Sequence, residues 1–191
     1  DNVGGYLGGA ARGSNYYRDC IFIGNSVTNN SSSGNGGAVF GFSSGDDAKF
    51  PMKFTAKPAI LDHCTVIGNV ANSTGGGGEG GGIFLCVASN GTRIAYNKSH
   101  AGGGGASRCV LVDCEIIGNV VTNKLEATTS QTSGGGILNC WATNCVIAGN
   151  KIWHQTSGQG SFSHGGGAAS SHLSGCVISN KIDTSNGGGV Y

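Results

Sequence analysis

Eight cysteines are the side chains with the widest range of possible chemistry in this sequence of 191 residues. Each stands at a fixed distance from a glycine cluster or from an asparagine turn, and together they form two columns: Cys86, Cys109 and Cys140, and Cys20, Cys64, Cys114, Cys145 and Cys176. Members of one column in neighbouring repeats, or close pairs such as Cys109 and Cys114, could form disulfides. The columns could equally be free thiols that point inward and pack as small apolar side chains. Because no two cysteines are spaced as C-x-x-C, we expect no metal site.

Acidic residues could cleave a polysaccharide if two of them lay together on one face beside a basic partner. Asp19 and Asp113 occupy equivalent places in repeats that are well separated, and Asp62, which is followed by His63, is one place out of step with them. We therefore interpret these carboxylates as solvated turn residues. The sequence predicts no catalytic residues and a protein that is not an enzyme.

Aromatic side chains beside polar ones could bind a sugar ring or a partner protein, because the faces of aromatic rings stack on such ligands. One group of this kind lies in a single loop and another in a long insertion, and the candidate binding residues are Trp153, His154, Phe162, His164, Phe50 and Phe54. Trp153 could instead fold back and cover its own loop.

A repeated unit positions all of these residues. In each copy a glycine cluster precedes a short apolar strand, a tight corner, a second strand and a turn that closes with asparagine. The copies differ in length because loops of different length follow the asparagine, and these loops should all leave from one edge. Stacked copies place like residues about 4.8 Å apart, so the asparagines should form a ladder of amide hydrogen bonds. The ladder residues are Asn25, Asn69, Asn97, Asn119, Asn150 and Asn180.

The alternation of side chains along a strand assigns each residue to the inner or the outer face. A position that accepts Glu115 faces water, so the cysteines beside it face inward. In the first strand Arg108 occupies the outward place, and alternation then predicts that Phe84 and Leu138 point inward. Three short inward-facing strands per coil should close a flattened triangular tube.

The sequence thus predicts an all-β solenoid of about six coils, in which residues 1–191 form a single segment. We expect this segment to belong to a longer array or an end-to-end stack, since neither end shows a capping helix. A formal net charge of +1 gives no reason to expect nucleic acid as a partner. No apolar run is long enough to span a bilayer as a helix, so we expect no membrane insertion of this segment.

The pairing of Gly-Gly-(Ala/Gly)-(Ile/Val) with an apolar-x-x-Asn strand end resembles the repeat of the chlamydial polymorphic outer-membrane proteins. Gly36-Gly37-Ala38-Val39 and Ile116-Ile117-Gly118-Asn119 are examples, whereas Val177-Ile178-Ser179-Asn180 departs from the pattern in lacking the glycine. The resemblance covers nearly the whole chain apart from the loops. It implies a right-handed parallel β-helix that is the passenger of an outer-membrane autotransporter and acts in adhesion.

We therefore expect a non-enzymatic, adhesin-type stalk at the bacterial cell surface or outside the cell. It would need no cofactor and would contact a host or neighbouring cell-surface protein or glycan. The first alternative is a structural subunit of an extracellular fibre that stacks through its uncapped ends. The second alternative is a β-helix enzyme that acts on polysaccharides.

Overall fold

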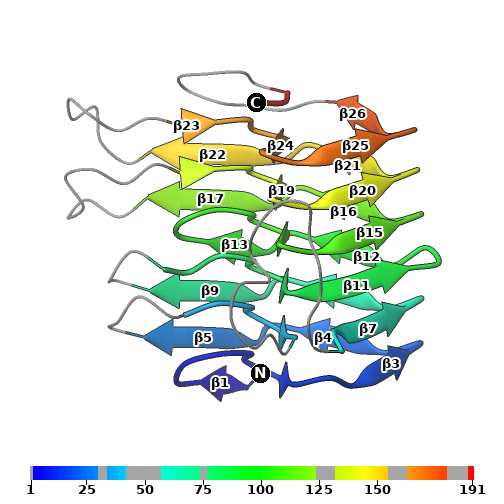
Figure 1. The fold of residues 1–191 in the computed structure, drawn as a ribbon. Coiled ribbons are helices and arrows are strands. Elements are labelled where there is room, and N and C mark those ends of the chain that lie inside the picture. Colours follow the sequence, from blue (N-terminus) through cyan, green and yellow to red (C-terminus); the bar gives the residue numbers. More distant parts are fainter. Residues whose placement is uncertain are drawn as a thin grey trace.

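The computed structural model describes residues 2–29, 34–41, 57–73, 77–123, 132–154, 163–179 and 189–191. Every regular element within these residues is a β-strand, and the strands form four parallel six-stranded sheets and one two-stranded sheet. The chain climbs as a right-handed parallel β-helix of about six coils (Figure 1). The fold expected from the repeat is confirmed.

Each coil gives one strand to each of four sheets, which we number in the order in which the chain meets them within a coil. The first sheet contains β2 (Ala11–Arg12), β6 (Val39–Phe40), β10 (Ile83–Phe84), β14 (Ala106–Ser107), β19 (Ile137–Leu138) and β24 (Ala168–Ala169). The second contains β3 (Tyr16–Arg18), β7 (Ala59–Asp62), β11 (Cys86–Ser89), β15 (Val110–Val112), β20 (Trp141–Thr143) and β25 (His172–Ser174).

The third and fourth sheets complete the coil. The third contains β4 (Ile21–Ile23), β8 (Thr65–Ile67), β12 (Arg93–Ala95), β16 (Glu115–Ile117), β21 (Val146–Ala148) and β26 (Val177–Ser179). The fourth contains β1 (Val3–Gly4), β5 (Ser26–Asn29), β9 (Val70–Ser73), β13 (Lys98–Ser99), β17 (Val120–Asn123) and β22 (Lys151–His154). The two-stranded sheet pairs β18 (Thr132–Ser133) with β23 (Ser163–His164).

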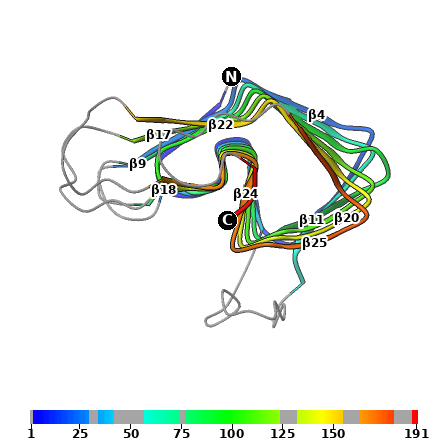
Figure 2. The same ribbon diagram turned by 90° about the horizontal axis from the view of Figure 1, so that it is seen from above.

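The cross-section of the coil is pinched rather than triangular, because the first sheet bends inward towards the fourth (Figure 2). The second glycine of each cluster lies at this waist. A Cβ atom on Gly104 would lie 2.2 Å from the carbonyl oxygen of Gly135 and 2.8 Å from the backbone nitrogen of Val120. Only glycine allows the two backbones to approach so closely. The expectation of three strands per coil in a flattened triangle is therefore wrong.

Left-handed backbone at the corners decides which side chains enter the core. Leu85 and Arg108 have φ angles of 54° and 55° at the corner between the first two sheets. This conformation breaks the alternation, so Ile83 and Cys86, on either side of the corner, both lie in the main core. Phe84 instead packs with Phe40 in a second cluster.

The prediction that Phe84 and Leu138 point inward is therefore wrong. Leu138 shares its register with Phe84 through Ser107. The column of Phe84 and Leu138 faces away from the main core. The neighbouring column faces into it and consists of Val39, Ile83, Ala106, Ile137 and Ala168. Ala59 pairs with Cys86 and continues the inward first cysteine column into the coil below.

The strands that precede the predicted loops end at one edge, and the loops themselves lie largely outside the described residues. β5, β9, β17 and β22 end side by side at the edge that Figure 2 shows opposite the second and third sheets. No helix in the described part of the chain has the length and hydrophobicity to cross a bilayer.

Candidate functional site

The cysteine columns are hydrogen-bonded ladders of thiols. All eight cysteines are free, so the disulfide alternative is not the state seen here. The thiol of Cys109 donates to the carbonyl oxygen of Ser107, two residues back across the corner, at 3.1 Å. The same sulfur accepts the backbone N–H of Cys86 from the coil below, at 3.4 Å. The contact recurs one coil higher, where Cys109 donates its N–H to the sulfur of Cys140.

Hydroxyl groups replace thiols at two places in the same columns. Thr92 replaces cysteine in the second column, where its hydroxyl donates to Ser89 at 2.7 Å and accepts the N–H of Cys64 at 3.1 Å. Ser171 replaces it in the first column and accepts the N–H of Cys140 at 3.0 Å. At these two places a small side chain both donates and accepts. Ala59, which pairs with Cys86 in the first column, can do neither, so the position favours such a side chain without requiring it.

Burial keeps the central thiols protonated. It raises the pKa of Cys109 and of Cys140 well above the usual thiol value. It also raises the pKa of Cys64. A protonated thiol can donate to the carbonyl group across its corner, whereas a thiolate could not. These three thiols therefore donate as neutral sulfur.

The asparagine ladder holds the neighbouring corner. The side-chain oxygen of Asn119 accepts both the backbone N–H and the side-chain NH₂ of Asn97, at 2.9 and 3.0 Å. The NH₂ of Asn97 also donates to the carbonyl oxygen of Val66 at 3.0 Å. The same bonds join Asn25 to Asn69, Asn69 to Asn97, and Asn119 to Asn150. The predicted single file of amides is confirmed for these five residues, and Asn180 lies outside the described residues.

Sequence reasoning missed one member of this ladder. Asn2 donates its backbone N–H and its side-chain NH₂ to the side-chain oxygen of Asn25, at 3.1 and 2.9 Å. No glycine precedes Asn2, so the glycine-asparagine signature does not mark it. The strand that follows identifies it, because Val3-Gly4 pairs in register with Ser26-Val27, the strand that follows Asn25.

The third glycine of each cluster packs against this ladder. A Cβ atom on Gly105 would lie 2.9 Å from the amide nitrogen of Asn119, and one on Gly136 would lie 2.9 Å from that of Asn150. The first glycine has a different role, because Gly103 adopts a φ of 56°. The three glycines thus provide a left-handed turn, the waist and the space for an amide.

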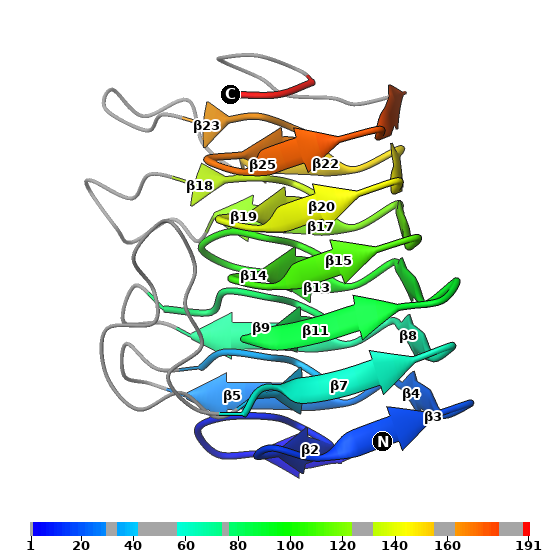
Figure 3. The same cartoon turned by 45° about the vertical axis from the view of Figure 1, so that its right-hand side comes forward.

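The outer face of the second sheet carries a column of aliphatic and aromatic side chains, apolar apart from the histidine at its upper end, that crosses every strand of that sheet. Its members are in register, and Figure 3 shows the strands that bear them one above another: Tyr16, Ile60, Val87, Val110, Trp141 and His172. Trp141 is 37 % exposed, and its ring lies 5.1 Å from that of His172. A polar column would be usual on the solvated face of a sheet. We therefore treat this column as the first candidate contact surface.

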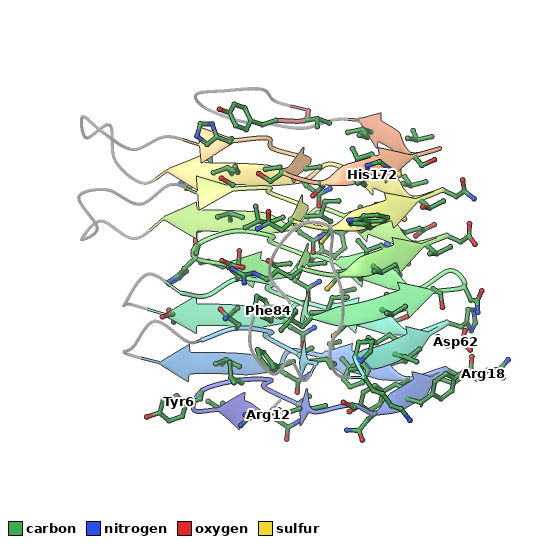
Figure 4. All side chains as sticks on the ribbon, in the orientation of Figure 1. Tyr6, Arg12, Arg18, Asp62, Phe84 and His172 are labelled. Atoms are coloured by element: carbon green, nitrogen blue, oxygen red, sulfur yellow. The ribbon has the colours of Figure 1, made fainter. Side chains whose placement is uncertain are left out.

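A polar cluster lies at the end of the same sheet, on its three lowest strands. The Tyr16 hydroxyl donates to the Asp62 carboxylate at 2.5 Å, and the Asn90 side chain donates to its other oxygen at 2.7 Å. Arg18 Nε lies 3.7 Å from the same carboxylate, and Figure 4 shows Arg18 below Asp62. The hydrogen bonds from Tyr16 and Asn90 lower the pKa of Asp62. The bond to Asp62 raises the pKa of Tyr16.

Asp19 and His63 extend this cluster. Both are left-handed corner residues of neighbouring coils, and His63 Nδ1 lies 2.7 Å from the Asp19 carboxylate. Arg18 Nε is 3.8 Å from Asp19, so one guanidinium group lies between two carboxylates. The interpretation of these carboxylates as solvated turn residues is confirmed for Asp19, whose side chain is 65 % exposed at a corner, and is wrong for Asp62, whose side chain is only 12 % exposed. Both dipeptides directly precede a cysteine of the second column, Arg18-Asp19 before Cys20 and Asp62-His63 before Cys64. Alignment on these cysteines places Arg18 beside Asp62 and Asp19 beside His63, which is a signal that the sequence contains.

The predicted aromatic binding residues do not form one site in the described structure. Trp153 is 57 % exposed, and Lys151 Nζ lies 5.8 Å from the centre of its ring. His164 stacks on Tyr191 with ring centres 4.0 Å apart. His154 lies in β22 with only its backbone described, and Phe162, Phe50 and Phe54 lie outside the described residues. A binding role for these six residues stays a prediction.

The described residues hold no cluster of three metal-binding side chains, and the comparisons with known proteins identify no site. Within the described residues, no three His, Cys, Asp or Glu side chains converge on a common point. No family model, curated protein or solved structure gives a significant match to this chain. The resemblance to the polymorphic outer-membrane protein repeat therefore stays a prediction.

Proposed function

We propose that this chain is a non-enzymatic, adhesin-type β-helical stalk that acts outside the cell, at the bacterial surface. The observation that supports the proposal is the apolar column from Tyr16 to His172 on the outer face of the second sheet. Soluble proteins seldom expose continuous apolar surface unless it binds something. At about 4.8 Å per coil, this column is about 24 Å long, which suits a protein surface or a glycan chain.

The scaffold favours such a contact because it is already ordered. Each interior strand of the four large sheets is held on both sides by parallel neighbours, and the corners are fixed by the asparagine and thiol ladders. A partner that docks on the column therefore costs little ordering of the protein. Trp153, which is exposed near the end of β22, would offer a second contact surface.

Adhesion of protein-coated beads to epithelial and bacterial cells tests this proposal. The variant Ile60→Ser with Trp141→Ser changes two outward side chains of the second sheet and should reduce bead attachment at least several-fold. The matched control is Val146→Ser with Val177→Ser on the third sheet, since Val146, at 38 %, is as exposed as Trp141. Equal attachment of both variants and the wild type would reject the column as the contact surface.

A fibre subunit is the first alternative, and one observation favours it. The backbone N–H groups of Gly167 and Ala168 donate to the carbonyl oxygen of Gly189, which begins the next coil. Equivalent backbone hydrogen bonds could join a coil of one copy to a coil of a second copy. Electron microscopy over a range of protein concentrations distinguishes the two functions. Filaments of constant width would support the fibre, and particles that stay monomeric would support the adhesin.

An enzyme acting on polysaccharides is the second alternative. It is favoured by the cluster in which Arg18 lies between the carboxylates of Asp19 and Asp62. A pair of carboxylates at short range is what glycosidic cleavage requires. Release of reducing ends or unsaturated sugars from acidic polysaccharides, abolished by Asp62→Asn, would establish this activity and overturn the non-enzymatic proposal.

A further inference from the structure

The second cysteine column ends in a pair of stacked thiols at each end. Cys20 lies beside Cys64 at one end, and Cys145 beside Cys176 at the other, each pair on neighbouring coils. Cys20 and Cys176 are partly exposed, whereas Cys64 and Cys145 are buried. The thiol of Cys145 interacts with that of Cys176 above it and that of Cys114 below it. Each end thus joins a buried sulfur to one that solvent can reach.

The spacing of stacked strands decides what these sulfurs can bind. Strands in register lie about 4.8 Å apart. This spacing lies within the range of Cα separations that a disulfide allows, so oxidation would join the two sulfurs directly, whereas a bound ion would lie between them. A metal bound to two thiolates in a line spans about 4.6 Å, if each metal–sulfur bond is about 2.3 Å as for zinc. A two-coordinate ion would therefore fit between stacked sulfurs without displacing the coils.

The number of ligands selects the kind of ion. In the described residues no third metal-binding side chain converges on either pair, so a tetrahedral ion such as zinc would lack half of its ligands. Soft thiolate ligands favour monovalent copper among the biological metals. We propose that the pairs Cys20–Cys64 and Cys145–Cys176 each bind one soft monovalent ion of the copper(I) class in a linear two-thiolate site.

Binding at each pair replaces two thiol protons by one ion. The protons leave to solvent, and the bound pair carries a net charge of −1. No electron is transferred, because the metal enters and stays as a monovalent ion. The first column offers the same spacing at Cys86, Cys109 and Cys140, but all three are fully buried. An ion can therefore reach the second column at its two ends without opening the core.

Silver(I) is a suitable probe because it is soft, monovalent and does not change its oxidation state. Native mass spectrometry of the reduced chain, freed of reductant under argon, should show two bound silver ions per chain. Alkylation of Cys20 and Cys176 by N-ethylmaleimide, followed by peptide mass spectrometry, should slow at least tenfold once the ions are bound.

Variants separate the two sites. Cys145→Ser should restore rapid alkylation of Cys176 while Cys20 stays protected, and Cys64→Ser should do the reverse. Both should fold, because Thr92 already places a hydroxyl in this column. Cys109→Ser should change neither protection. If Cys145→Ser fails to fold, Cys176→Ser serves instead and should lose one ion while Cys20 remains protected.

Three results would overturn the proposal. The first is unchanged alkylation in the presence of silver. The second is continued protection of Cys176 in Cys145→Ser, which would mean that a single thiol suffices. The third is formation of a disulfide between the stacked cysteines in place of ion binding.

Discussion

The side-chain oxygen of Asn119 lies 2.9 Å from the backbone nitrogen of Asn97 and 3.0 Å from its side-chain nitrogen. One acceptor therefore satisfies two donors of the coil below, both of them buried. We expect Asn119→Ala to lower the free energy of unfolding by roughly 2–5 kcal/mol, since a buried donor left without a partner costs about 1–3 kcal/mol. Urea denaturation followed by circular dichroism measures the loss.

The matched control for this prediction is Asn15→Ala. Asn15 is exposed and its side chain donates to Arg12 and Tyr17 at the surface. We expect a change within about 0.5 kcal/mol, as for most surface substitutions. Equal losses in the two variants would contradict a stabilising role for the ladder.

The close backbone contact at the waist predicts that substitution of Gly104 destabilises the protein more than substitution of Gly5. A methyl group on Gly104 would meet the Gly135 carbonyl oxygen at 2.2 Å, whereas one on Gly5 would meet nothing within 4 Å. Gly104→Ala should therefore destabilise the protein by several kcal/mol, since overpacking alone costs about 1–3 kcal/mol and here the obstacle is backbone. Gly5→Ala should leave the thermal midpoint within a few degrees. A comparable drop in both midpoints would show that the waist tolerates a side chain.

The thiol ladder predicts an unusual order of stability at Cys109. Cys109→Ser keeps a group that can donate to Ser107 and accept from Cys86, whereas Cys109→Val removes both bonds. Unsatisfied buried groups cost about 1–3 kcal/mol each, so the serine variant should be the more stable of the two. A purely apolar position would give the opposite order. Chemical denaturation of the two variants under reducing conditions decides between them.

The lowered pKa of Asp62 predicts how the stability of the first coils depends on pH. Because the folded-state pKa is lowered, the stabilising contribution is present above the unfolded value, about 3.9 for aspartate, and is lost as pH falls through the folded value. Asp62→Asn should therefore be less stable than the wild type at pH 7, and the difference should shrink below about pH 4. Urea midpoints at pH 7, 5 and 3 measure it.

Asp113→Asn provides the comparison for that prediction. Asp113 is an exposed carboxylate at the corner that Asp19 and His63 also occupy, in a coil further along the stack. Its substitution should change the urea midpoint little at any of the three pH values. A dependence on pH as large as that of Asp62→Asn would assign the effect to surface charge in general.

The repeat pattern predicted the stacked parallel coils, the amide ladder and the inward cysteines because each follows from period and spacing alone, but it did not predict the fourth sheet. The positions of Phe84 and Leu138 could not be predicted by alternation, since Leu85, Arg108 and Asn139 adopt left-handed backbone that L-residues other than asparagine seldom use. To predict the contact between Arg18 and Asp62, one must know how β3 and β7 align, and a long insertion separates these two strands in the sequence. That register is fixed by strand pairing and is only implicit in the sequence.

The amide ladder also makes the coils interchangeable. Asn97 and Asn119 are 22 residues apart and hold equivalent places on successive coils. Lys98 pairs with Val120, and Val120 pairs with Lys151, so the chain leaves each asparagine along the same path. Excision of residues 98–119 would bring Asn97 directly beneath Asn150, with every strand of the remaining coils still facing a strand of its own kind. The length of this molecule can thus be shortened or extended in steps of one coil, about 4.8 Å each.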